Sequence, residues 1–449
     1  MIISSILKNN NNLNKYNLVI YNNYLKILHY LNIIDHHKII NKLRVGIFSY
    51  YLENGGRARV TSFLLNYLSH INFFDLYLYC NKKKENNQYL INENIKRILI
   101  KNYRIKNVIK EIIKKRLDIF IYQFSDFDEI NILNFLKNIK IIFIQHQSLF
   151  FWIYSNYTYF KYLYKTYKKS RFIISLIHLE NDYIFKKWGI KTILMNNFIT
   201  YDYNHSFPSN LESKNIIMIG RADDKFKRFE LGIQAMEYII KEIPECQMKI
   251  ISNLSNIFFL ENALNNLILK SNIKFYNYTS NPEIYFKNTS LHVSTSISES
   301  FGLVLSETKI FGIPNILVGL DYISIKKGGV IIIYDDSAES IAKEAYKILM
   351  NNQNKKKMGN EARISMKHFK NDNLLKKWLK LILSIYFYND YQRLRETDKK
   401  ISEKEALEIL QKQIKLLNMR KTTKKNITTN DIENFTLIEK INNINYLSS

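Results

Sequence analysis

The chain has 449 residues and a formal net charge of +26, from 66 Lys and Arg residues against 40 Asp and Glu residues. This length exceeds one compact core and fits two domains, and the 46% of hydrophobic residues argue against a wholly disordered protein. The positive charge favours an anionic partner (a phosphate ligand, a nucleic acid or a lipid surface) unless it reflects a lysine-rich composition without a binding role. The only cysteines, Cys80 and Cys246, do not support a disulfide framework or a cysteine metal site, which favours a reducing, cytoplasmic compartment.

The first residues lack the apolar segment and the cleavage site of a secretory signal, and no 18-residue window is free of polar residues. We therefore expect neither a signal peptide nor a membrane-spanning helix. Residues 1–40 are Asn-rich and then carry a Leu/Ile/Tyr pattern, which predicts a helical N-terminal extension.

Short β-branched runs alternate with longer amphipathic segments from Arg44 onward, a pattern typical of a parallel sheet with crossover helices. A helix is expected from Ala58 to about Ser69. The strands expected in this first half are VGIFSY (45–50), DLYLYC (75–80), LDIFIYQ (117–123), KIIFIQH (140–146), RFIISLI (171–177) and TILMNN (192–197).

A second series of strands follows the break at Phe207-Pro208-Ser209. Its members are NIIMIG (215–220), QMKIIS (247–252), NIKFYNY (272–278), LHVSTS (291–296), PNILVG (314–319) and VIIIY (330–334). The sequence thus predicts two α/β halves with a ligand crevice at the carboxyl ends of the strands.

The predicted organisation has five parts. They are an extension (1–40), a Rossmann-like domain (41–207), a second Rossmann-like domain (208–372), a terminal helix that crosses back to the first domain (373–395) and a polar tail, helical in part (396–449).

Basic residues follow the strand that opens the second half. The strand ends at Gly220, and Arg221, Lys225 and Lys227 come before a helix that is expected to start near Arg228. A guanidinium and an ammonium group at this edge suit a diphosphate, although a solvated basic loop would have the same composition.

Two glutamates, Glu299 and Glu307, flank the turn Phe301-Gly302 in the segment SISESFGLVLSETKIFGIP (296–314). Ser300, Phe301 and Gly302 are expected to turn into a helix that begins at Leu303, whose free N–H groups can hold a diphosphate. A glycosidase acid/nucleophile pair is disfavoured, because Glu299 precedes the helix and Glu307 lies inside it. We expect each carboxylate to contact a different sugar ring.

These residues resemble the retaining GT-B glycosyltransferases of family 4, in which a Glu, seven residues, Glu element with a Phe-Gly turn follows a strand. The Gly220-Arg221 pair with Lys227 resembles the element that opens the second domain of that family. The resemblance extends from about Arg44 to Tyr388. It implies a GT-B fold and transfer of a sugar from a nucleotide-diphosphate donor to a hydroxyl acceptor, with retention of configuration.

The resemblance also assigns roles. Arg221 and Lys227 would bind the donor diphosphate, with Lys225 as a competing register for the lysine. Glu299 would contact the donor sugar and Glu307 the ribose, and the donor would also touch the backbone of Gly220, Ser300, Phe301, Gly302 and Leu303.

Two features of the first half extend this site. Gly55 and Gly56 resemble the glycine pair that precedes the first helix of the family and would leave room for donor or acceptor against bare backbone. His146, at the end of a strand, has the approximate place of an active-site histidine, although a lone histidine there is also compatible with a structural role.

Asp126-Phe127-Asp128 follows an apolar strand, as does the Asp-x-Asp metal site of the other large glycosyltransferase fold. Because Asp126 and Glu129 also form a capping box, we interpret these residues as a helix cap. No metal or other cofactor is therefore expected, and the nucleotide sugar acts as co-substrate.

Alternative functions remain open at this level. A non-catalytic protein of the same fold would bind nucleotide sugars or glycans without transfer, and a nucleic-acid-binding protein would explain the charge but lacks a recognised motif. The expected acceptor is a glycan or a lipid-linked glycan. The basic aromatic runs 101–117 and 160–171 could bring the protein to an anionic membrane, where lipid acceptors lie.

Overall fold

The computed structural model describes residues 42–388, except for residues 50, 53–54, 82–88, 101–103, 124–128, 150, 153–156, 202, 205, 254–259, 261–266, 280–281, 321–322 and 324. The extension predicted for 1–40, the tail at 396–449 and the Asp126–Asp128 motif lie outside the described residues.

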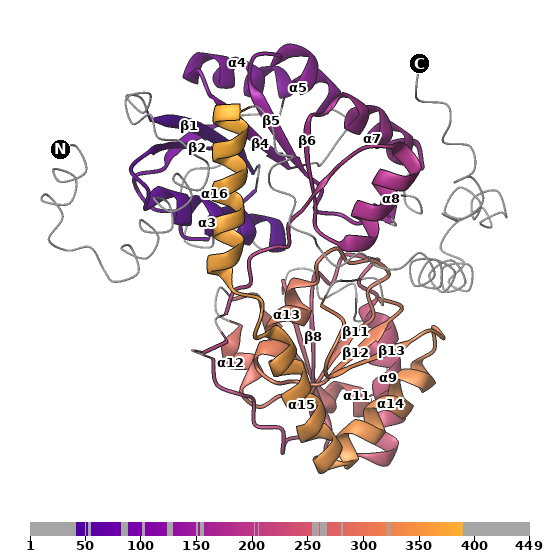
Figure 1. The fold of residues 1–449 in the computed structure, drawn as a ribbon. Helices are drawn as coiled ribbons and strands as arrows, with labels where there is room; N and C mark the ends of the chain where they lie inside the picture. Colours follow the sequence, from indigo (N-terminus) through magenta and orange to yellow (C-terminus); the bar gives the residue numbers. More distant parts are fainter. Residues whose placement is uncertain are drawn as a thin grey trace, which may run out of the picture. The chain divides into compact units, whose positions relative to one another are not determined.

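The protein contains two parallel β-sheets flanked by helices, as the sequence predicts (Figure 1). The strand order is β3-β2-β1-β4-β5-β6-β7 in the first sheet and β10-β9-β8-β11-β12-β13 in the second. In each sheet the chain first runs outward from a central strand and then reverses, which places a topological switch point between β1 and β4 and another between β8 and β11. Ligands of open α/β sheets bind at such points.

The strands of the first sheet are β1 (Leu43–Phe48), β2 (Phe74–Cys80), β3 (Lys96–Leu99), β4 (Ile119–Gln123), β5 (Lys140–Ile144), β6 (Phe172–Ser175) and β7 (Ile193–Leu194). Those of the second are β8 (Asn215–Ile219), β9 (Gln247–Ser252), β10 (Ile273–Asn277), β11 (Leu291–Ser294), β12 (Asn315–Val318) and β13 (Val330–Ile333). Every predicted strand is present with slightly different ends. The edge strand β3 was not predicted, because its four residues include Lys96 and Arg97 and lack a hydrophobic run.

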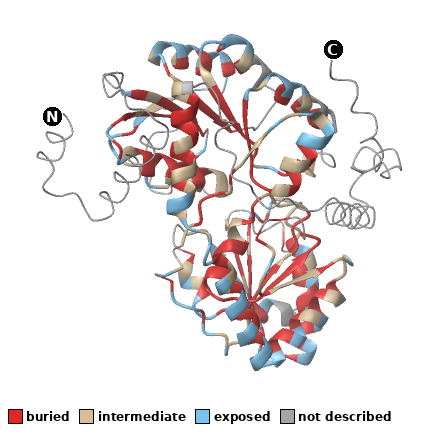
Figure 2. Ribbon diagram, in the orientation of Figure 1, coloured by how far each residue is buried: buried red, intermediate tan, exposed pale blue. Residues whose placement is uncertain are grey.

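The helices of the first half are α3 (Gly56–Ser69), α4 (Ile105–Lys115), α5 (Glu129–Phe135), α7 (Tyr157–Lys169) and α8 (His178–Trp188). They are followed by α9 (Phe229–Glu242), α11 (Leu267–Asn272), α12 (Glu283–Phe286), α13 (Leu303–Ile310), α14 (Ala338–Met350), α15 (Asn352–Met366) and α16 (Asn371–Tyr388). The inner strands of both sheets are largely buried, as parallel strands covered on both faces require, whereas the outer strands β3, β7, β10 and β13 are mostly intermediate or exposed (Figure 2).

Contacts between residues divide the chain into two compact units. Among the described residues, the first unit contains those of 42–144, 165–174 and 371–388, and the second contains those of 145–164 and 175–370. Helix α16 therefore groups with the first unit, where Tyr67 donates a hydrogen bond to Asp372 (2.5 Å) and Lys140 donates one to the Tyr386 carbonyl (2.6 Å). The domain boundary predicted between residues 207 and 208 stays a prediction.

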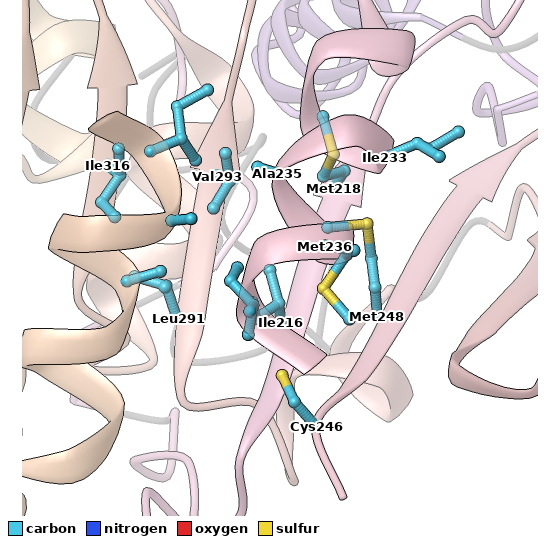
Figure 3. Close-up of a cluster of buried hydrophobic side chains, with 14 of the residues drawn as sticks. Ile216, Met218, Ile233, Ala235, Met236, Cys246, Met248, Leu291, Val293 and Ile316 are labelled. Carbon is cyan, nitrogen blue, oxygen red and sulfur yellow. The ribbon is translucent and has the colours of Figure 1, made fainter. Parts of the chain in front are cut away.

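The core of the second unit lies between its sheet and helices α9 and α14, and Figure 3 shows the side chains that fill it. Gly232 brings α9 close to β8, because a Cβ atom at this position would lie 2.3 Å from the sulfur of Met218. This close packing fixes where α9 begins and therefore where the loop between β8 and α9 lies.

Candidate functional site

Two loops at the switch point of the second sheet carry most of the predicted site residues. One joins β8 to α9 and contains Gly220, Arg221 and Lys227, and the other joins β11 to α13 and contains residues 295–302. Because β8 and β11 are adjacent parallel strands, both loops leave the same edge of the sheet. The structure thus brings together residues that lie about 70 positions apart in the chain.

Hydrogen bonds join the two loops. The Thr295 hydroxyl lies 2.7 Å from the Lys227 carbonyl oxygen and 2.9 Å from that of Arg228, and the Ile297 N–H donates to the Phe226 carbonyl at 2.8 Å. These contacts fix the backbone on both sides of Lys227. Sequence reasoning did not single out Thr295, because its partners come from a distant segment.

Lys227 and Glu299 form an ion pair across the two loops. Their side chains are 23% and 25% exposed, so the pair is reachable from solvent but partly shielded from it. The lysine stem packs against Gly220, where an added Cβ would lie 3.4 Å from its Cγ and Cδ atoms. An ammonium and a carboxylate at a switch point can bind the phosphate and the hydroxyl groups of a ligand.

Arg221 has a different partner. Its guanidinium pairs with Asp224 at 2.6 Å within the same loop, and the other carboxylate oxygen of Asp224 accepts the Phe226 N–H at 3.1 Å. The Arg221 side chain is 62% exposed. Arg221 and Lys227, the two residues predicted to bind the diphosphate, therefore lie at the same edge of the sheet, and each pairs with a carboxylate. The sequence identified neither Asp224 nor its pairing with Arg221.

Arg228 holds the start of α9 in place. Its backbone is left-handed (φ 48°), and its side chain donates to the Thr295 carbonyl (2.9 Å) and pairs with Asp336 (2.5 Å). A left-handed conformation is costly for a residue other than glycine, and these partly buried bonds compensate the strain. Asp336 follows β13, and nothing in the sequence suggested its contact with Arg228.

The first turn of α13 can hold an anion. Gly302 precedes the helix with φ +81°, a region that favours glycine, and no acidic residue lies in the first turn. The ring of Phe301 is fully buried and meets Phe369 edge to face (6.2 Å), which fixes the turn from below. Free N–H groups at the helix start therefore lie beside Ser300 and Leu303, both partly exposed, as the sequence predicts.

Glu307 is a buried residue of α13. It is 1% exposed, and its carboxylate accepts a hydrogen bond from the Thr200 hydroxyl at 2.7 Å. Separate tasks for the two glutamates stay a prediction. No pattern in the sequence pointed to Thr200, which lies 107 residues earlier.

Behind the site, Lys309 on α13 is buried. Its ammonium donates to the carbonyls of Ile325 (2.5 Å) and Lys327, and burial lowers its pKa from 10.5 to about 7. Ile323 and Ile325, on the same loop, would contact a Cβ atom placed at Gly302, at 3.4 and 3.7 Å. Lys309 therefore ties the loop that covers Gly302 to the helix that follows it.

His146 follows β5 in the segment 145–149, which reaches the two site loops. The Ser298 hydroxyl donates to the Ser148 hydroxyl (3.1 Å), and the rings of Phe151 and Phe226 lie 4.6 Å apart. The role of His146 stays a prediction. Gly55 and Gly56 belong to the first unit, where Gly55 (φ +122°) precedes α3 and Gly56 is its first residue.

Within the residues that the structure describes, no group of His, Cys, Asp and Glu side chains has the arrangement of a metal site. Over the same residues, no helix is long and apolar enough to cross a membrane.

Comparisons with known proteins agree with this geometry. Residues 202–365, which include both site loops, match the family model of glycosyl transferases group 1. The chain is similar to the poly(glycerol-phosphate) alpha-glucosyltransferase of Bacillus subtilis (strain 168), with 28% identity over 117 residues that cover 26% of this chain and 16% of the relative.

Two solved structures share the fold. Sucrose-phosphate synthase of Thermosynechococcus elongatus matches with a TM-score of 0.65 and 14% identity over 78% of this chain and all of that chain. A variant of S. aureus TarM, solved with UDP and alpha-GlcNAc-glycerol, matches with a TM-score of 0.51 and 19% identity over 61% of this chain and 58% of that chain. The chain thus spans 16% of the curated relative and little more than half of TarM, and it has the two-sheet GT-B fold, with residues 202–365 similar to glycosyl transferases group 1.

Proposed function

We propose that the protein is a retaining glycosyltransferase of family 4 that moves a sugar from a nucleotide-diphosphate donor to a hydroxyl group of a glycan or glycolipid. The observation that carries the proposal is the Lys227–Glu299 pair, held by Thr295 at the switch point of the second sheet, inside the segment that matches group 1. The UDP bound by the TarM variant and the glucosyltransferase name of the Bacillus relative support this class of donor.

The donor would lie along the carboxyl edge of the second sheet. Its diphosphate would meet Lys227, Arg221 and the start of α13, because cations and free N–H groups gather there. Glu299, at the mouth of the same loop, would contact the sugar. Glu307, deeper in α13 beside Thr200, would accept hydrogen bonds from the ribose hydroxyls.

The reaction breaks the bond between the anomeric carbon and the diphosphate oxygen and forms a bond to the acceptor oxygen on the same face. The acceptor proton passes to the departing diphosphate, whose growing negative charge Lys227, Arg221 and the helix start would stabilise. None of these steps requires a covalent enzyme intermediate. Because protein groups supply the positive charge, we propose that no metal is needed, and activity should then persist in excess EDTA.

A screen of nucleotide sugars for hydrolysis, transfer and thermal stabilisation tests the proposal. One nucleotide sugar should raise the melting temperature and be consumed. Arg221→Ala and Glu299→Ala should abolish most transfer without loss of fold, and Glu307→Ala should weaken donor binding. Stabilisation without turnover would favour a non-catalytic binder, and full activity in both Arg221→Ala and Glu299→Ala would overturn the assignment.

We also propose that the protein acts at the cytoplasmic face of an anionic membrane. On α4, the residues Ile105, Val108, Ile109 and Ile112 are buried, whereas Lys106, Lys110 and Lys114 are exposed beside Ile113, which is 55% exposed. An exposed apolar side chain among lysines suits the interface of a bilayer with negative lipids. Flotation with phosphatidylglycerol vesicles should carry the protein, phosphatidylcholine vesicles should not, and equal flotation with both would contradict the proposal.

A further inference from the structure

A buried carboxyl group in the second unit has no role in the mechanism proposed above. Glu180 lies on α8, is 2% exposed and is surrounded on its own helix by buried Leu179, Tyr183 and Ile184. Glutamate is rarely buried to this extent unless it has partners, because burial of an unpaired carboxyl group is costly. Its retention in an apolar position therefore calls for a specific contact.

The contacts of Glu180 are with the segment that follows β5. Its Oε1 atom accepts the Leu149 N–H at 2.6 Å, and the Ser148 hydroxyl also hydrogen-bonds to the carboxyl group. Burial raises the pKa of Glu180 to about 8, and no charged side chain contributes to this shift. At neutral pH the group is thus largely a neutral acid, which can donate one hydrogen bond while it accepts another.

The same serine reaches the candidate site. The Ser148 oxygen accepts a hydrogen bond from Ser298 at 3.1 Å, and Ser298 directly precedes Glu299, the partner of Lys227. Glu180, Ser148 and Ser298 therefore form a continuous chain of hydrogen bonds. We name these three residues the serine relay.

We propose that Glu180 is a positioning residue, which acts through the serine relay to hold Glu299 in the orientation that the transfer reaction needs. This inference rests on the proposed function. A serine hydroxyl has only one proton to donate. The hydrogen bond between Ser148 and Glu180 therefore determines whether Ser148 donates or accepts in its hydrogen bond with Ser298. Without Glu180, neither the Leu149 N–H nor the Ser148 hydroxyl has its buried partner, and the loop that carries Ser298 loses its fixed neighbour.

Two substitutions separate the hydrogen bonds of Glu180 from its volume. Glu180→Gln keeps an acceptor for Leu149 and a donor for Ser148, as the neutral acid does. Glu180→Leu fills a similar space but has neither an acceptor for Leu149 nor a donor for Ser148. Ser148→Ala removes the middle residue of the serine relay and leaves Glu180 in place. This variant tests the same coupling if Glu180→Leu does not fold. Ser290→Ala is the matched control, because this buried serine of the same unit bonds to the Leu211 carbonyl (3.0 Å), away from both site loops.

Hydrogen exchange measures the coupling without any need for activity. Glu180→Leu and Ser148→Ala should increase amide exchange at least fivefold both in residues 145–149 and in residues 296–302, whereas Glu180→Gln and Ser290→Ala should leave both segments unchanged. Unchanged exchange at 296–302 in Glu180→Leu and in Ser148→Ala would overturn the serine relay, whatever the protein catalyses.

Steady-state kinetics with the donor found in the screen test the consequence. Glu180→Leu and Ser148→Ala should lower kcat at least tenfold with the donor KM within threefold of wild type, and Glu180→Gln should stay within threefold of wild type in both constants. An equal loss in the glutamine and leucine variants would refute the positioning role. If the exchange result holds but the wild-type protein transfers no sugar, the proposed function fails and the serine relay stands as a structural coupling only.

Discussion

At the residue scale, three cations of the candidate site each pair with a carboxylate. Lys227 pairs with Glu299, Arg221 with Asp224, and Arg228 with Asp336. A ligand phosphate must therefore compete with a carboxylate of the protein for each cation. Burial raises the pKa of Glu180 to about 8 and lowers the pKa of Lys309 to about 7.

Removal of the charge of Glu299 should separate binding from transfer. Glu299→Gln is expected to bind a free nucleoside diphosphate about tenfold more tightly, because Lys227 no longer pairs with a carboxylate, while transfer falls at least a hundredfold. Isothermal titration calorimetry measures the first effect and product formation the second. The control is Glu245→Gln, which removes the carboxylate from the exposed Lys214–Glu245 pair (2.5 Å), and weaker binding in Glu299→Gln would contradict the argument.

Glu180 should make stability fall with rising pH. Its pKa is raised from 4.5 to about 8, so between these values the folded state keeps a proton that the unfolded state has lost. The free energy of unfolding should decrease through this window, by at most about 1.4 kcal/mol for each pH unit. Urea denaturation from pH 5 to pH 8 should show that Glu180→Gln flattens this slope, and a parallel slope in the variant would contradict the prediction.

Lys309 should have the opposite effect in a higher window. Its pKa is lowered from 10.5 to about 7, so between pH 7 and pH 10.5 the unfolded state holds a proton that the folded state has released. Stability should rise with pH over this range. Lys309→Met should remove this increase in stability with pH. The variant should also lower the free energy of unfolding by the same amount at every pH, because the Ile325 and Lys327 carbonyls lose their donor. Exposed Lys343, changed to Met, should keep the slope of the wild type.

At the element scale, the two site loops are determined by how their helices begin. Helix α9 starts after the left-handed Arg228, and α13 starts after the left-handed Gly302. The side chain of Arg228 has two bonding partners, the Thr295 carbonyl and Asp336, whereas Gly302 reaches the same conformation without strain. The start of each helix is thus determined by the residue directly before it and not by the neighbouring strand.

Gly302 and Gly189 allow a matched comparison. Both have positive φ (+81° and +67°), and Gly189 ends α8 with open space around it. An alanine at either position should cost about 1–2 kcal/mol of stability because of the left-handed backbone. Only Gly302→Ala should also weaken donor binding, since a strained alanine would disturb the start of α13, where we propose that the donor diphosphate binds. Equal donor affinity in both variants, measured by calorimetry, would argue against a diphosphate site there.

At the scale of the whole molecule, the charge of +26 predicts how the protein responds to salt. Weak binding to RNA or DNA in a gel shift should disappear above about 0.2 M NaCl, because such binding depends on released counterions. Thermal stabilisation by the nucleotide sugar should persist at the same salt concentration, since it depends on partly shielded groups such as Lys227 and Glu299. Tight nucleic-acid binding in high salt, without donor stabilisation, would favour the nucleic-acid alternative.

The positions of most strands along the chain could be read from the sequence, because each buried parallel strand is a continuous apolar run, such as IIMI before Gly220. The candidate site residues that follow β8 and β11 could be identified for the same reason, because the ends of these two strands could be located. Their partners could not, because Asp336, Thr200 and Ser148 meet Arg228, Glu307 and Ser298 only when segments more than 100 residues apart fold together. Lys96 and Arg97 concealed the edge strand β3.

The pairing of Lys227 with Glu299 implies an order of events. While the lysine holds one oxygen of the carboxylate, both groups have fewer hydrogen-bonding positions left for a substrate, and a neutral sugar alone brings no charge that competes for the ammonium group. A phosphate that takes the ammonium would release the carboxylate at the moment the sugar arrives on the same molecule. Glu299 would then contact a sugar only while that sugar is still attached to its nucleotide, and the protein would not recognise a free monosaccharide.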